Sequence, residues 1–83
     1  MFATIDPLRL KLSSDQKVLE VNYSPTSEKP LFDICDLEGR VIKTGIVSAN
    51  SLKIKVSDLI NEMYILLILD GEEVRTKRFQ ISR

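Results

Sequence analysis

The chain has 83 residues, of which 43% are hydrophobic and 29% are charged, and its twelve Lys and Arg residues balance twelve Asp and Glu residues. This length allows one core, so residues 1–83 are expected to form a single domain, and the zero net charge provides no long-range attraction for nucleic acid or an anionic membrane. Histidine is absent, which removes the commonest general base and metal ligand and argues against an enzyme and against a cofactor.

Apolar and polar residues alternate with a period of two along most of the chain, which is typical of half-buried β-strands. We expect a first strand over roughly residues 7–13, a turn at 13–16, and a loop at 24–30, where two prolines fall among small polar residues. An acidic residue and a glycine at 36–40 predict a hairpin turn. The apolar residues of the strands in this part of the chain are Leu8, Leu10, Leu12, Leu19, Val21, Tyr23, Phe32, Ile34, those of 41–47, Leu52, Ile54 and Val56.

The second half of the chain contains a short connection followed by the most apolar segment. Residues 57–62 are too few for a stable helix, so we expect a connection there. Residues 63–69 are apolar at every position, which predicts a central strand that is covered on both faces.

The chain ends in a second hairpin. Asp70 and Gly71 predict its tight turn, and residues 72–81 predict the last strand, with Phe79 and Ile81 facing inward. Together the segments predict an all-β fold, a small immunoglobulin-like β-sandwich of about seven antiparallel strands.

No catalytic pair or metal site emerges from the spacing of the reactive residues. Without histidine, Cys35 lacks the base of a Cys-His nucleophile, and we expect it to be a small buried residue. Asp33, Asp36 and Glu38 offer too few oxygen ligands for calcium, so we expect Asp36 to cap its turn and Glu38 to face water.

Charged residues near the C-terminus have a structural interpretation as well. We expect the acids of the last hairpin to form a solvated tip, and the bases of the last strand to protect a sheet edge rather than to bind a phosphate or anionic glycan. The acids are Asp70, Glu72 and Glu73, and the bases are Arg75, Lys77, Arg78 and Arg83.

The N-terminal residues lack the basic stretch and the run of about 7–15 apolar residues that mark a signal peptide, so we expect no export signal there. Residues 63–69 fall far short of the roughly 20 apolar residues that span a bilayer. We expect Met1 to start either an excised piece of a longer protein or a stand-alone domain.

An ordered series of motifs between residues 32 and 81 resembles the C-terminal sorting domain of proteins exported by the type IX secretion system of Bacteroidetes. The family series is a turn of the form D-x-x-G-[RK]-V, a V-S-x-L segment, a G-x-Y-x-L-x-I strand, and a final basic-basic-Phe strand. In this chain Glu62 stands where the third motif has glycine. The matching residues are Asp36, Gly39, Arg40, Val56, Ser57, Leu59, Tyr64, Leu66, Ile68, Lys77 and Phe79.

The resemblance implies a non-catalytic sorting and anchoring module, recognised by a protein partner in the outer-membrane translocon and carried by a longer protein that is secreted or held at the cell surface. Backbone edges and the surfaces of residues 63–69 and 72–81 are the expected contact with that partner, because strand pairing and exposed side chains are what a sandwich can offer. The motif positions with an implied structural or recognition role are Asp36, Gly39, Arg40, Ser57, Leu59, Tyr64, Lys77 and Phe79.

The alternative is a stand-alone immunoglobulin-like interaction or carbohydrate-binding module. The chain has no Trp and only two Tyr, which is few for a surface that stacks on sugar rings. The sequence leaves the oligomeric state and the strand order open.

Overall fold

A computed structural model describes residues 8–83, and the regular structure in this range consists of seven β-strands. The strands are β1 (Arg9–Leu12), β2 (Val18–Asn22), β3 (Leu31–Asp36), β4 (Val41–Ile46), β5 (Ser51–Lys55), β6 (Met63–Asp70) and β7 (Glu73–Gln80). Within the described range there is no helix of the length and apolarity needed to traverse a membrane.

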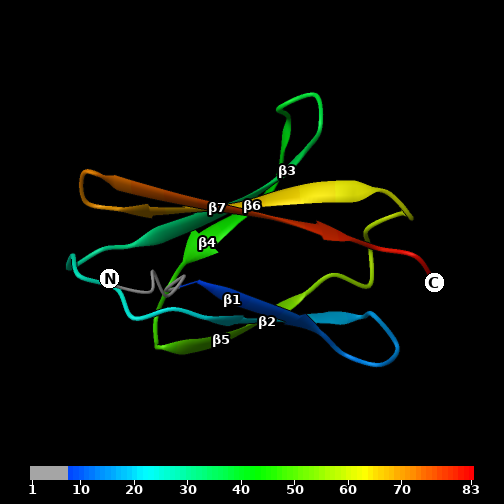
Figure 1. The fold of residues 1–83 in the computed structure, drawn as a ribbon, viewed down its shortest axis with the longest axis horizontal. Helices are drawn as coiled ribbons and strands as arrows, with labels where there is room; N and C mark the ends of the chain where they lie inside the picture. The colour runs from blue at the N-terminus through cyan, green and yellow to red at the C-terminus, as the bar shows by residue number, and fades with distance from the viewer. Residues whose placement is uncertain (1–7) are drawn as a thin grey trace, which may run out of the picture.

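The strands form two sheets that lie face to face (Figure 1). The smaller sheet has the order β1-β2-β5, the larger has the order β4-β3-β6-β7, and all neighbouring strands are antiparallel. Strands 1, 2 and 5 therefore face strands 3, 4, 6 and 7, which is an immunoglobulin-like sandwich arrangement. The predicted fold class is confirmed.

One hydrophobic core fills the space between the two sheets. It is built from every second residue of the strands, because successive side chains point to opposite faces, and Phe79 and Ile81 face inward as predicted. The buried core residues are Leu8, Leu19, Val21, Tyr23, Phe32, Ile34, Val47, Ile54, Val56, Leu59, Tyr64, Leu66, Ile68, Phe79 and Ile81.

The predicted boundaries are close to those observed. β1 begins at Arg9 rather than at residue 7, which lies outside the described residues. Residues 57–62 form the expected connection, in which the backbone N–H of Leu59 donates to the carbonyl of Val56 at 3.0 Å.

The prediction that β6 is covered on both faces is wrong. β6 is central, since β3 and β7 pair with its two sides, but its residues alternate between buried and half-buried positions. Only one face of each sheet packs on the other sheet, so an antiparallel sandwich buries half of such a strand. The second face of β6 therefore carries apolar side chains that remain accessible.

Arg83 is exposed as expected, but it lies beyond the end of β7 rather than in the edge strand, and its side chain makes specific contacts. Its guanidinium group donates to the carbonyls of Val56 at 2.6 Å and Leu59 at 2.8 Å, and to that of Gln16 at 3.1 Å. The side chain of Asn61 donates to the carbonyl of Arg83 and accepts from its N–H, both at 3.1 Å. The end of the chain is thereby tied to the connection between β5 and β6.

Candidate recognition site

The turn between β3 and β4 is organised by the carboxylate of Asp36. Its Oδ1 accepts hydrogen bonds from the backbone N–H groups of Glu38 and Arg40, both at 2.9 Å, and its Oδ2 accepts from Nε of Arg40 at 2.7 Å. Hydrogen bonds from the backbone N–H of Arg40 and from the guanidinium of the same residue hold the pKa of Asp36 below its ordinary value. The predicted capping role of Asp36 is present in the structure, and Glu38 is exposed.

Gly39 and a β-bulge shape this hairpin. Gly39 has φ = 86°, a left-handed conformation that glycine adopts without steric cost. The β3–β4 register shifts between Ile34 and Cys35, leaving an extra residue in β4, and such a bulge bends and twists its strand. The turn stands clear of both layers at the top of Figure 1.

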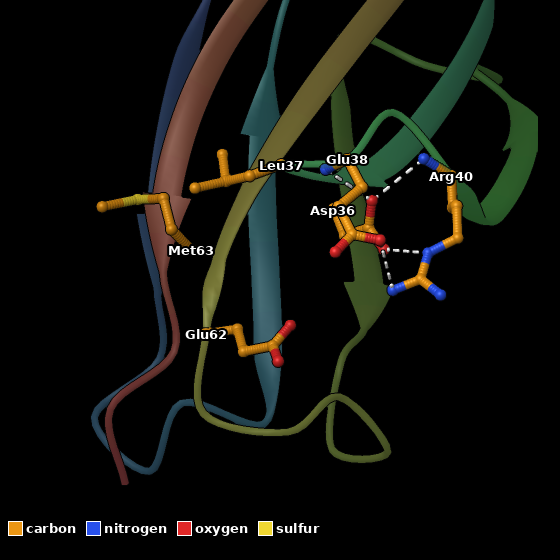
Figure 2. Close-up of a pocket in the computed structure, with 6 residues that line it drawn as sticks. All are labelled: Asp36, Leu37, Glu38, Arg40, Glu62 and Met63. Carbon is orange, nitrogen blue, oxygen red and sulfur yellow. Dashed lines mark hydrogen bonds and ion pairs between the residues drawn. The ribbon is translucent and has the colours of Figure 1, made fainter.

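Figure 2 shows how the side chains of the hairpin divide between two sides. Leu37 and Met63 lie on one side, whereas Arg40 lies on the other and bridges Asp36 and Glu38. These residues and Glu62 line a shallow pocket of about 240 Å³. The guanidinium of Arg40 pairs with Asp36 and Glu38, whereas the carboxylate of Glu62 takes no part in these ion pairs.

Three of the motif residues lie in one row across the larger sheet. Asp36 pairs with Tyr64, and Tyr64 pairs with Phe79 in the strand register. The rings of Tyr64 and Phe79 stack with centroids 5.6 Å apart, and the Tyr64 hydroxyl donates to the carbonyl of Ile60 at 2.8 Å. Leu59 is buried in the core beside them. The row joins the hairpin turn to one end of the core.

The remaining motif residues lie apart from this row. Ser57 is half-buried in the connection between β5 and β6. The ammonium group of Lys77 donates to the carbonyl of Leu8 at 2.9 Å, which links β7 to the residue before β1. The motif positions are therefore spread over the fold and do not meet in one cleft.

The prediction that Asp70 is part of a solvated tip is wrong, although Glu72 and Glu73 are exposed. Asp70 is only 2% exposed, and its carboxylate accepts from the Tyr23 hydroxyl at 2.6 Å, the Ser27 N–H at 2.7 Å and the Thr26 N–H at 2.8 Å. Donors on Ser27, Tyr23 and Thr26 hold the pKa of Asp70 far below its ordinary value. These contacts fix the loop between β2 and β3 and are distant in sequence, so local turn patterns could not have indicated them.

Apolar side chains gather on the face of the larger sheet that points away from the core. Because cross-strand partners share a face, the register places Ile46, Leu31, Leu69 and Val74 in one row across all four strands. The exposed fraction is 63% for Ile46, 41% for Leu31 and 58% for Val74. We call these four residues, together with the half-buried Met63, Ile65 and Leu67 of β6, the outer apolar face.

Reactive groups in the described part of the chain do not form a catalytic arrangement. Cys35 is buried, and burial, with lesser contributions from Asp33 and Asp36, raises the pKa of its thiol, which disfavours the nucleophilic thiolate. No three acidic, cysteine or histidine residues of the range 8–83 are placed to hold a metal ion. The described residues thus define a small β-sandwich whose notable surfaces are a projecting hairpin and the outer apolar face.

A comparison with known protein families assigns this small β-sandwich to a family. The family model of the secretion system C-terminal sorting domain matches residues 13–82, which is most of the chain. The chain belongs to this family, the C-terminal sorting domains of the type IX secretion system. Among the curated proteins no match was found.

Proposed function

We propose that this domain is a non-catalytic sorting module that a protein of the outer-membrane translocon recognises through the outer apolar face. The longer protein that carries the domain is thereby delivered to the cell surface. The observation that carries the proposal is the accessible apolar row across β4, β3, β6 and β7 in a member of a sorting-domain family. Exposed contiguous apolar surface is typical of a protein interaction site.

The last two strands supply most of the residues of the outer apolar face. Leu69 and Val74 are partners in the β6–β7 register, and Leu67 lies on the same side of β6. The sequence favours these strands for a different reason, since strand pairing and exposed side chains are what a sandwich can offer a partner. Both considerations favour the β6–β7 part of the outer apolar face as the main contact.

A carbohydrate-binding role is less well supported by the fold. The four aromatic residues in the range 8–83 are all buried, and none offers an open ring face for stacking on a sugar. These residues are Tyr23, Phe32, Tyr64 and Phe79.

The proposal is tested by fusing residues 1–83 behind an exported reporter in a cell with a working type IX system. We expect the wild-type fusion at the cell surface and the Leu69→Thr/Val74→Thr fusion retained in the periplasm, because the substitutions add polar groups to the contact. Ile60→Thr is the control, since Ile60 is 66% exposed but lies on the connection between β5 and β6. Surface labelling of the reporter gives the readout. Wild-type retention would refute the sorting role, and normal export of the double variant would refute the proposed face.

A further inference from the structure

The four edge strands of the sandwich differ in how well they are protected against strand addition. Edge strands commonly carry charged side chains, especially lysine, which oppose pairing with another chain. β1 carries Arg9 and Lys11, β5 carries Lys53 and Lys55, and β7 carries three bases and an acid. β4 is the exception among them.

β4 has one charged residue, Lys43, and this residue forms an ion pair within the domain. The ammonium group of Lys43 lies 2.8 Å from the carboxylate of Asp58, and the side chain is 23% exposed. The same strand exposes Val41, Ile42 and Ile46. β4 is therefore an apolar edge without an outward-pointing charge.

Half of the backbone groups of β4 point away from β3. The N–H of Val47 donates to the carbonyl of Pro30 at 2.9 Å, which marks a hydrogen-bonded pair at this end of the ladder. Hydrogen-bonded and non-hydrogen-bonded pairs alternate in an antiparallel ladder. Gly45 and Lys43 accordingly face β3, whereas Thr44 and Ile46 turn their N–H and C=O groups to the open edge.

A groove runs beside this edge, between β4 and β5, with a volume of about 370 Å³. Its apolar lining comes from Phe32, Leu52 and Ile54, and its charged lining comes from lysines. The lysines are Lys43, Lys53 and Lys55. The ring of Phe32 lies against Gly45, where a Cβ would be 2.5 Å from the ring.

We propose that β4 accepts an extended segment of another protein that alternates apolar and acidic side chains. Strand addition supplies main-chain hydrogen bonds from the open edge, and alternate side chains supply specificity. The partner residues that lie opposite Thr44 and Ile46 would point to the same side as the outer apolar face. We therefore expect these partner residues to be apolar. Partner residues on the other side of the added strand lie over the lysine-lined groove, so they are acidic.

Charge also distinguishes this partner from a second copy of the chain. Antiparallel pairing of β4 with another β4 would place the two lysine-lined grooves side by side, so that Lys53 and Lys55 of one copy approach those of the other. Like charges facing each other across strands are destabilising. The proposal rests on the edge itself and holds whether or not the added strand belongs to the translocon.

The test is titration of the purified chain with a short acetylated and amidated peptide of alternating valine and glutamate, followed by NMR. We expect saturable binding, with slowed hydrogen exchange at the amides of Thr44 and Ile46. A peptide of alternating valine and lysine is expected not to bind, because the groove repels it. No binding of the glutamate peptide, or equal binding of both peptides, would overturn the proposal.

Two variants distinguish the contribution of the β4 backbone from that of the lysine charges. Thr44→Pro removes an N–H that points to the open edge and is not part of the β3 ladder, and we expect it to abolish binding. Lys53→Gln/Lys55→Gln is expected to weaken binding roughly three- to tenfold, the range for one or two surface ion pairs. Arg9→Gln/Lys11→Gln is the charge-matched control on the other edge of the same sheet and is expected to bind normally.

The outcomes remain decisive if Thr44→Pro fails to fold, because the lysine variant and the exchange data report on the same contact. Equal weakening by the two charge variants would overturn the proposal and indicate nonspecific attraction. Concentration-dependent dimerisation that protects Thr44 and Ile46 without peptide would overturn it in favour of a second copy. Reporter export in cells is a separate readout, so failure here is distinguishable from failure of the sorting role.

Discussion

Asp70 shows how one buried charge can organise a loop. Its carboxylate lies at the end of β6 and accepts hydrogen bonds from Tyr23 and Thr26 as well as Ser27, which are more than forty residues earlier in the chain. A buried carboxylate is costly unless donors of this kind surround it, and their removal leaves several buried polar groups unpaired. Asp70 therefore couples the β2–β3 loop to the last hairpin.

The stability of the domain should depend on the ionisation of Asp70. Because its folded-state pKa lies below the ordinary value of 3.8, its contribution is present above that pH and is lost as the pH falls further. We expect Asp70→Asn to lower the free energy of unfolding at pH 7 and to flatten the decline below about pH 4. Urea unfolding at pH 7 and pH 3 measures both effects. Glu72→Gln, on the exposed turn beside it, should leave both values unchanged, and similar behaviour of the two variants would contradict the assigned role.

At the scale of elements, the pairing of β3 with β4 depends on a close contact between Phe32 and Gly45. A Cβ on Gly45 would lie 2.5 Å from Cε2 and 2.7 Å from Cζ of the Phe32 ring, and these distances require the ring or the strand to move. Phe32 is part of the core, so its ring cannot swing into solvent without loss of packing. Glycine at this position allows the ring to lie across the edge strand.

We expect Gly45→Ala to destabilise the domain by about 1–3 kcal/mol, which is the usual cost of overpacking. The cost should shrink in a Phe32→Leu background, because the smaller side chain leaves room for the added methyl group. Chemical denaturation of the four proteins in a double-mutant cycle measures this coupling. Additive effects of the two substitutions would show that the ring contact is not the cause.

The strands could be predicted from the sequence because their period of two is a local property. The turn at Asp36 to Arg40 could be predicted for the same reason, since the acid and the glycine lie within one tight turn. The contacts of Asp70 and Arg83 depend on which distant segments of the chain meet in the fold. The residues next to them in the sequence therefore do not indicate these contacts. Likewise, the apolar sequence of β6 indicates a central strand but does not tell which of its faces is covered.

On the scale of the whole molecule, the sandwich has two outer faces of different character. The outer face of the smaller sheet carries Arg9 and Lys11 on β1 and two lysines on β5, as expected for a solvated surface. The outer face of the larger sheet carries the apolar row instead. The larger sheet also places Asp33 beside Leu67 and Arg78 beside Ile65 on this face, so the two outer faces differ in the apolar row rather than in a complete absence of charge.

Adjacent residues of β6 test this two-sided description, because Leu66 faces the core and Leu67 belongs to the outer apolar face. Leu66→Ala should cost about 2–5 kcal/mol of unfolding free energy, the range for a truncated core leucine. Leu67→Ala should cost about 1 kcal/mol or less, since the half-buried side chain loses fewer contacts. Chemical denaturation at two protein concentrations gives both values and detects any self-association. Equal costs for the two variants would mean that the outer apolar face is covered in solution, and a concentration dependence would identify a second copy as the cover.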